Sequence, residues 1–178
     1  MFHRSQNLFL RPAFPEDAAA IFAGIGEEAI IRNLARAPWP YTLDDAHEFA
    51  ARPQDPRLPH FLVTLPGHGV IGSAGLGEHE GEPELGYWIA RAHWGRGYAT
   101  EAAGAVLRIA RTLGHTRLVA GHFVDNPASG RVLRKLGFVP TGRIAKRSCR
   151  GRGAAVDTVE YAIDCDARMP PCEVSRAA

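Results

Sequence analysis

The stretch HWGRGYATEA, residues 93–102, constrains the fold of this chain more than any other feature of its sequence. An apolar run, ELGYWIA, precedes the stretch, and an amphipathic run, GYATEAAGAVLRIARTLG, begins within it. Gly95 and Gly97 therefore lie between a predicted strand and a predicted helix, although glycine is unfavourable inside either element. The chain either turns tightly at this junction or brings its bare backbone close to a ligand.

The first half of the chain is predicted to contain helices followed by a meander of strands. A short strand at 8–13 opens the chain, and Thr42 caps the last of three helical stretches. The helical stretches are 15–25, 27–35 and 42–52, and the strands of the meander are 60–65, 69–77 and 82–90. Their β-branched and apolar residues, separated by turns rich in glycine, indicate antiparallel pairing.

The second half alternates helices and strands. A helix over 97–114 is followed by a strand, and a second helix then begins with Asn126 as its cap and Pro127 at its first position. The predicted strands around the second helix are 117–124, 138–146 and 155–163. The whole pattern predicts an α/β (α+β) fold, with a mixed central sheet of about six to seven strands flanked by four to five helices.

Length and composition predict one domain over residues 1–165 and a disordered tail over 166–178. No apolar run approaches the roughly 20 residues that span a bilayer, and no signal peptide is present, so no membrane association is expected. Cys149, Cys165 and Cys172 match no zinc spacing and predict free thiols in a reducing cytoplasm. The histidines also lack a metal-binding spacing, so no metal site is expected.

Charge is distributed unevenly along the chain. Residues 1–90 carry 6 basic and 12 acidic side chains, whereas residues 91–152 carry 13 basic and 2 acidic side chains, a net charge of +11. Such a block indicates a polyanionic partner, either a nucleic acid or a phosphate-rich cofactor. The arginines fall on several elements and match no RNA- or DNA-binding motif, so a nucleic-acid partner is not expected.

Three kinds of phosphate site use glycines at a strand-to-helix junction. A Walker loop requires G-x-x-x-x-G-K-S/T, which is absent. A dinucleotide fingerprint requires a small residue at Thr100 and an acidic residue about 20 positions later, which VAGHF does not supply. The third kind is a pyrophosphate cradle of the backbone N–H groups from Gly95 to Ala99, to which Arg96 would add a mobile charge. A tight turn without a ligand is the alternative.

The wider set of motifs resembles the GCN5-related N-acetyltransferase (GNAT) superfamily, and within it the RimJ/RimL-like branch. The family's acetyl-CoA motif, Q/R-x-x-G-x-G/A, is similar to WGRGYA, with Trp94 in the place of glutamine or arginine. NPASGRVLRKLGF is similar to the family's N-x-x-S/A…K-x-G-F helix. LFLRPAFPEDA and RAPWPYTLDDA are similar to the opening strand and the lid-like helical pair of the branch, so the resemblance covers residues 8–163.

The resemblance implies that acetyl-CoA is a co-substrate, and that its acetyl group passes directly to a primary amine, either a protein N-terminal α-amine or a small-molecule amine. The pantetheine arm would pair with the backbone of Tyr87, Trp88 and Ile89. The side chains of Tyr87 and Trp88 are expected in the core. The residues implied in cofactor binding are Tyr87, Trp88, Ile89, Trp94, Gly95, Arg96, Gly97, Tyr98, Ala99, Thr100, Asn126, Ser129 and Arg131.

The acceptor ammonium has to lose a proton before its nitrogen can attack, and a carboxylate acting through water is the usual base of the family. Glu84 is the expected general base, because it opens the strand that would bind the pantetheine arm. Glu82, Glu78 and His79 are rivals in the same hairpin. A solvated surface role is the alternative for each of these groups.

The leaving thiolate has to gain a proton. Many relatives use a tyrosine four residues before the G-F pair of the second helix, but Leu133 occupies that place here. Rim-like members carry a serine in N-x-x-S instead, which Ser129 matches, so Ser129 is the expected acid and an ordinary helix-start serine is the alternative. Asn126 would both cap the helix and bond the pantetheine arm.

The resemblance places the acceptor pocket at the lid around RAPWPY and at the loop RSCRGRG. Trp39 and Tyr41 would wall this pocket, or would only anchor the lid. The partners expected are acetyl-CoA and an amine acceptor, for a protein that is a monomer or a homodimer. Two other function classes stay open, namely an acetyl-CoA sensor without turnover and a basic nucleic-acid-binding module, which salt-dependent RNA retention would favour.

Overall fold

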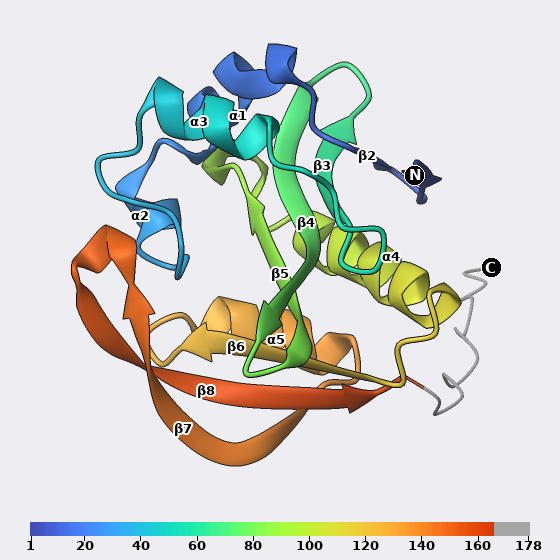
Figure 1. Ribbon diagram of the computed structural model, residues 1–178, viewed down its shortest axis with the longest axis vertical. Helices are drawn as coiled ribbons and strands as arrows, with labels where there is room; N and C mark the ends of the chain where they lie inside the picture. Colours follow the sequence, from blue (N-terminus) through green and yellow to red (C-terminus); the bar gives the residue numbers. More distant parts are fainter. Residues whose placement is uncertain (166–178) are drawn as a thin grey trace, which may run out of the picture.

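The computed structural model describes residues 1–165, which form one mixed sheet of eight strands with helices on both faces (Figure 1). The predicted tail over 166–178, including Cys172, lies outside the described residues. In order across the sheet, the strands are β1 (His3–Arg4), β2 (Phe9–Arg11), β3 (His60–Leu65), β4 (Gly69–His79), β5 (Glu82–Ile89), β6 (Arg117–Phe123), β8 (Ala154–Asp164) and β7 (Val139–Cys149). Only β5 and β6 are parallel neighbours. No helix within residues 1–165 is long and apolar enough to cross a membrane.

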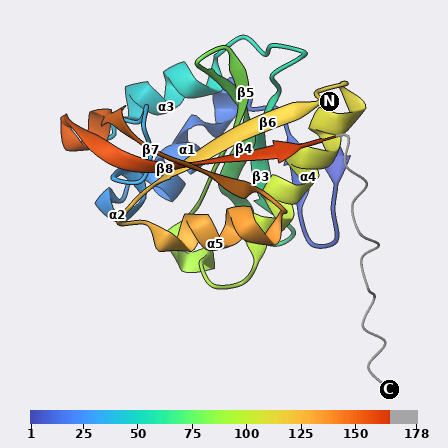
Figure 2. The same cartoon turned by 90° about the horizontal axis from the view of Figure 1, so that it is seen from below.

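Two sets of helices cover opposite faces of the sheet (Figure 2). The helices are α1 (Ala18–Ile25), α2 (Glu28–Ile31), α3 (Leu43–Ala50), α4 (Tyr98–Thr112) and α5 (Pro127–Lys135). The first three pack with Leu62 of β3 and Trp88 of β5 in one hydrophobic cluster. The other two pack with Leu85 and Ile89 of β5 in a second cluster. Because side chains alternate along a strand, β5 contributes to both clusters.

The α/β class and the central crossover are confirmed, and the sheet has eight strands where six to seven were predicted. The additional strand, β1, has two residues and is too short to show a periodicity in the sequence. Two predicted helix caps are confirmed. Thr42 accepts from the backbone N–H of Asp45 at 3.2 Å, and the side chain of Asn126 accepts from Ser129 N at 3.4 Å.

The helical stretch predicted over 27–35 is wrong in its length, because α2 ends at Ile31. A continued helix would bond Ala29 O to the backbone N–H of Asn33, but the Asn33 side chain takes this place, with Nδ2 donating to Ala29 O at 2.9 Å. The turn after β7 satisfies the carbonyls that follow. Cys149 Sγ lies 3.3 Å from Leu34 O, Arg150 N donates to Ala35 O at 3.0 Å, and Arg152 Nε donates to Arg32 O at 2.7 Å. The segment after α2 is therefore tied to the far edge of the sheet.

The sheet splits between β5 and β6. These strands form a single residue pair, Glu84 with Val119, and then run apart (Figure 1). Beyond this pair, β5 stays with β4 and β6 stays with β8. The edge of β5 from Leu85 to Ile89 therefore has no neighbouring strand on the side of the split.

The ladder between β4 and β5 shows which backbone groups face the split. Ala90 N donates to Ile71 O at 2.8 Å, so this pair is a hydrogen-bonded pair of the antiparallel ladder. Such pairs alternate along the strands, so Trp88 and Gly86 also direct their backbone groups to β4. The N–H and C=O groups of Tyr87 and Ile89 then point the other way, into the split.

Candidate active site

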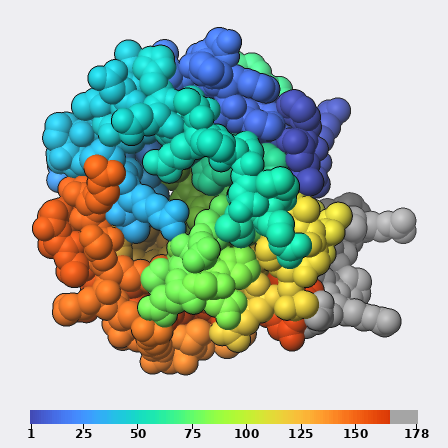
Figure 3. Space-filling view, viewed as in Figure 1, coloured from blue at the N-terminus to red at the C-terminus, as the bar shows by residue number. Residues whose placement is uncertain are grey.

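One cavity of about 1230 Å³ lies at the split and is bordered by both halves of the sheet. The space-filling view shows the molecule hollowed between the blue-to-cyan helical segments and the green β4–β5 hairpin (Figure 3). The residues singled out from the sequence that line this cavity are Tyr41, Glu84, Tyr87, Trp88, Ile89, Trp94, Gly95, Gly97, Tyr98, Ala99, Thr100, Asn126, Ser129 and Arg131. Of the residues singled out as sites, Trp39 and Arg96 lie outside the lining, and both are exposed.

The turn before α4 has the backbone that its glycines indicate. Gly95 and Gly97 have φ of 74° and 83°, in the left-handed region that favours glycine. A Cβ atom at either position would have no atom within 4 Å, so the space above both residues is open. Gly97 is the N-cap of α4 without a side-chain cap bond, which leaves the first N–H groups of the helix for an anion.

Trp94 fixes the end of the split nearest to this turn. Its indole Nε1 donates to the carbonyl of Ile89 at 2.6 Å. This bond occupies one of the outward-facing groups of β5 and holds the turn against the strand. The backbone N–H groups of Tyr87 and Ile89 remain directed into the split.

Tyr87 and Ser129 meet on the α5 side of the split. Their hydroxyl oxygens are 2.8 Å apart, and the Ser129 carbonyl oxygen, 3.3 Å from the Tyr87 hydroxyl, is an alternative acceptor for the same proton. Burial raises the pKa of Tyr87 to about 12, with the bond to Ser129 acting in the opposite direction. Tyr87 therefore keeps its proton at neutral pH and can donate it to Ser129. The prediction for Trp88 is confirmed, since its side chain is buried in the core, whereas the Tyr87 hydroxyl is one of the polar groups of the site.

Glu84 lies where the split begins, and its carboxylate is held by an arginine. Glu84 Oε1 forms a short ion pair with Arg147 Nη1 of β7, and Arg147 Nη2 is 3.6 Å from Glu160 Oε1 of β8. Within the described part of the chain, only Oε1 of Glu84 has a hydrogen-bond partner, so Oε2 can accept from water. The sequence missed Arg147, since only the register of β7 and β8 brings it to Glu84.

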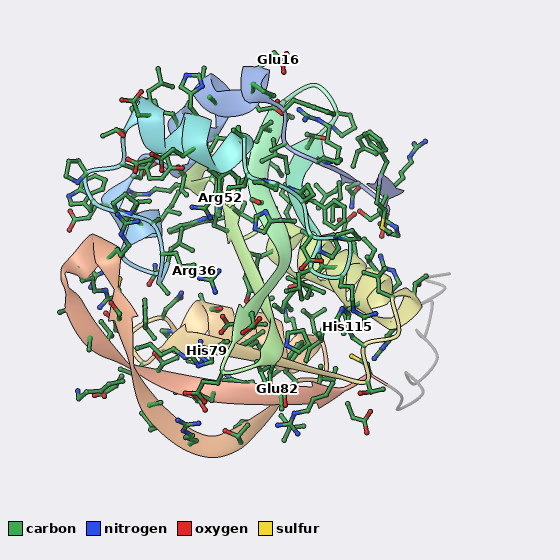
Figure 4. The ribbon with its side chains drawn as sticks, in the orientation of Figure 1. Glu16, Arg36, Arg52, His79, Glu82 and His115 are labelled. Carbon is green, nitrogen blue, oxygen red and sulfur yellow. The ribbon has the colours of Figure 1, made fainter. Side chains whose placement is uncertain are left out.

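The rivals of Glu84 lie at the β4–β5 turn, outside the cavity lining (Figure 4). His79 Nε2 is 3.8 Å from Glu80, and Glu82 Oε1 is 3.9 Å from Arg117. Glu78 contributes its backbone carbonyl to Arg36 at 2.7 Å. Glu84 is thus the one of the four that borders the split.

The lid around RAPWPY contributes the side chain of Tyr41 to the cavity. Its side chain is 8% exposed, and burial, followed by the charge of Asp45, raises its pKa to about 12. The Tyr41 hydroxyl therefore stays protonated at neutral pH. Trp39 is 42% exposed and does not line the cavity.

Known proteins resemble this chain in both sequence and fold. A family model described as "Acetyltransferase (GNAT) domain" matches residues 7–139. A Bacillus subtilis protein, "Uncharacterized N-acetyltransferase YoaA", is 30% identical over 169 residues, which are 89% of this chain and 94% of the relative. A GNAT-family acetyltransferase structure from Bacillus anthracis has a TM-score of 0.79 at 24% identity and covers 93% of this chain and 99% of its own. The structure of RimL, a ribosomal L7/L12 α-N-protein acetyltransferase in complex with coenzyme A, has a TM-score of 0.77 at 20% identity and covers 94% and 100%.

Proposed function

Because the chain belongs to the acetyltransferase (GNAT) family, we propose that residues 1–165 form one domain that transfers an acetyl group from acetyl-CoA to a primary amine. The observation that carries the proposal is the split between β5 and β6, where the glycine turn, the Tyr87–Ser129 pair and Glu84 border one cavity. The amine would belong to a protein N-terminus or to a small molecule. The RimJ/RimL-like resemblance and the α-N-protein activity named for RimL support the first of these.

The residues of the split fit the shape and the charge of acetyl-CoA. The pyrophosphate would lie on the N–H groups from Gly95 to Ala99, where the open space above both glycines admits oxygen atoms. The pantetheine arm would pair with the free N–H groups of Tyr87 and Ile89 as an added strand does. Asn126 and Arg131 line the other side of the cavity and would contact the arm and its phosphates.

The acceptor amine would approach the thioester at the start of the split, beside Glu84. Glu84 Oε2 would accept the proton from the ammonium through a water molecule. The free amine nitrogen then forms a bond to the acetyl carbon while the carbon–sulfur bond breaks, and the nitrogen gives up its second proton to water as the neutral amide forms. The bonding electrons leave with the sulfur as a thiolate, and backbone N–H groups of β5 would stabilise the negative charge on the carbonyl oxygen.

The Tyr87–Ser129 pair would protonate the leaving thiolate. With Tyr87 as the donor to Ser129 Oγ, the proton of the Ser129 hydroxyl is free to bond the sulfur. This bond strengthens as charge develops on the sulfur, so it favours the transition state over the ground state.

We expect Ser129→Ala to lower kcat by about 1–3 kcal/mol of transition-state stabilisation, or roughly 5- to 150-fold, with the KM for acetyl-CoA nearly unchanged. The measurement is steady-state release of coenzyme A, followed with a thiol reagent at saturating amine. Ser129→Cys should recover part of the loss. Ser148→Ala, a change of an exposed serine outside the cavity, is the control and should have no effect. An alanine variant with the wild-type kcat would assign Ser129 to the helix start alone.

The proposed function is tested by a turnover screen with N-terminal peptides, polyamines, amino acids and aminoglycosides, together with calorimetry of acetyl-CoA binding. We expect binding of acetyl-CoA and release of coenzyme A with at least one class of amine. Binding without turnover on any amine would favour the sensor alternative. Failure to bind acetyl-CoA would overturn the proposal.

A further inference from the structure

Three glycines, Gly75, Gly77 and Gly86, line the part of the cavity that faces α1 and α3, and we call them the glycine floor. Gly75 of β4 pairs with Gly86 of β5, and Gly77 pairs with Glu84, so these positions share the face to which Trp88 points. A Cβ atom at Gly86 would have nothing within 4 Å, which shows open space above it. A Cβ atom at Gly75 would collide with His60, and one at Gly77 would lie 3.4 Å from Arg36 Nη1. The absent side chains thus leave room beside Glu84 and let Arg36 and His60 lie close to the sheet.

Two arginines border this space, and we call them the arginine pair. Arg36 and Arg52 both extend into the space between the α2–α3 segments and the central strands (Figure 4). Arg36 Nη2 donates to Glu78 O at 2.7 Å, and the guanidinium of Arg52 lies 5.7 Å from the centre of the Phe49 ring. Neither guanidinium has a carboxylate within 4.0 Å among residues 1–165, in contrast to Arg147 with its two glutamates. These contacts hold both side chains in place, and no ion pair within the described residues offsets their positive charges.

The pKa of His60 indicates the sign of the charge in this region. Ser73 Oγ donates to Phe61 O at 2.7 Å, so it accepts from His60 Nδ1 at 3.1 Å, which assigns the neutral tautomer with a free Nε2. Burial, and then the charges of Arg52 and Arg36, lower the pKa of His60 to about 4. No carboxylate acts on His60 in the opposite direction within the described residues.

Three of the acidic residues that line the cavity interact with other groups, and Glu84 is the one that pairs with Arg147. Asp45 accepts from Thr42 N and Thr42 Oγ1 in the cap of α3 and also experiences the charge of Arg150. Asp55 accepts from Arg57 N at 2.8 Å. Glu48 lies near Tyr41, where it opposes the effect of Arg52 on that hydroxyl. Because Arg52 and Arg36 are the charged groups that act on the pKa of His60, the region above the glycine floor next to His60 is positively charged.

We propose that the acceptor is a primary amine that carries an anionic group, a carboxylate or a phosphate, and that Arg36 and Arg52 bind this group. The inference rests on the proposed function, because it takes the amine to lie at the split beside Gly86 and Glu84. Guanidinium groups bind both anions through paired charge-assisted hydrogen bonds. Arg36 lies over Gly77 of β4, one strand from β5, and Arg52 acts on His60 of β3, two strands from β5. With these strand spacings, amine and anion would be separated by roughly 5–10 Å.

The test compares acceptors that differ only in the anion. The matched pairs are β-alanine with its amide, γ-aminobutyrate with its amide, and O-phosphoethanolamine with ethanolamine, so that carboxylate and phosphate are distinguished. We expect at least one anionic member to have a kcat/KM at least tenfold above that of its neutral partner. In the Arg36→Gln/Arg52→Gln double variant this preference should disappear, while the neutral member keeps its rate within twofold. Arg57→Gln, an exposed arginine outside the cavity, should leave the preference intact.

Equal rates for all matched pairs, or equal losses for both members in the double variant, would overturn the proposal. A second measurement does not require turnover. Addition of O-phosphoethanolamine should raise the pKa of His60, followed by NMR of its ring, because the anion offsets the charge of the arginine pair. This change should be absent in the double variant and retained in Arg57→Gln. If no amine is acetylated but His60 responds in this way, the proposed enzymatic function fails and the anion site stands; an unresponsive His60 overturns the anion site.

Discussion

Replacing Glu84 by glutamine should lower kcat about 10²-fold or more, the usual contribution of a positioned general base. Glutamine keeps the shape of the side chain, and its carbonyl oxygen can still accept from Arg147, so the ion pair is replaced by a hydrogen bond. The acidic limb of the pH–rate profile should shift toward the pKa of the amine itself, because the amine then loses its proton to bulk water. The measurement is coenzyme A release over about pH 6–10. This range covers the pKa values of an α-amine, about 8, and of lysine, about 10.

Glu82→Gln is the matched control, since Glu82 lies on the same strand but does not line the cavity. It should leave both kcat and the pH profile unchanged. The affinity for acetyl-CoA should be nearly the same in both variants, as measured by calorimetry. A Glu84→Gln variant with an unaltered profile would remove Glu84 as the base and leave it as the partner of Arg147.

Gly97→Asp should weaken acetyl-CoA binding by more than about 10²-fold. A carboxylate about 5 Å from the pyrophosphate costs about 3 kcal/mol at the effective dielectric constant of a protein surface. Aspartate tolerates the left-handed backbone better than most residues, so the variant should fold. The measurement is the Kd for acetyl-CoA by calorimetry, after circular dichroism has shown a folded protein.

Two variants separate charge from backbone strain in this experiment. Gly97→Asn places a neutral side chain of the same shape at the turn and should lose less affinity than the aspartate. Gly114→Asp places the same charge at another glycine with positive φ, 81°, where a Cβ atom also meets nothing within 4 Å. Gly114 does not line the cavity, and its substitution should leave the Kd unchanged. Equal losses in Gly97→Asp and Gly114→Asp would mean that the cradle is wrongly placed.

Local sequence signals predicted much of the fold because they act within a few residues. The caps at Thr42 and Asn126 and the glycine turn at Gly95 and Gly97 are of this kind, and each lies where it was predicted. The end of α2 was missed, because it depends on hydrogen bonds to Cys149 and the turn that follows it, more than 100 residues away.

The backbone conformation of the site could be predicted better than the contacts between its side chains. The turn before α4 follows from its glycines, and the exposed edge of β5 was expected from the family resemblance. The partners of the proposed catalytic groups depend on register across the sheet: Arg147 is 63 residues from Glu84, and Tyr87 is 42 residues from Ser129. Tyr87 could have been found by alternation, since it has the parity of Leu85 and Ile89 and therefore faces the side of α5.

The hydrogen bonds between the segment after α2 and the turn after β7 have a consequence for how the substrates arrive. They join the two halves of the sheet a second time, at the opposite end from the Glu84–Val119 pair. The two halves of the sheet are therefore held together at two places beside the cavity, whose opening is visible from one face (Figure 3). If the proposed function holds, we expect coenzyme and acceptor to enter this cavity without the two halves swinging apart. The reacting groups would then stay in place between turnovers.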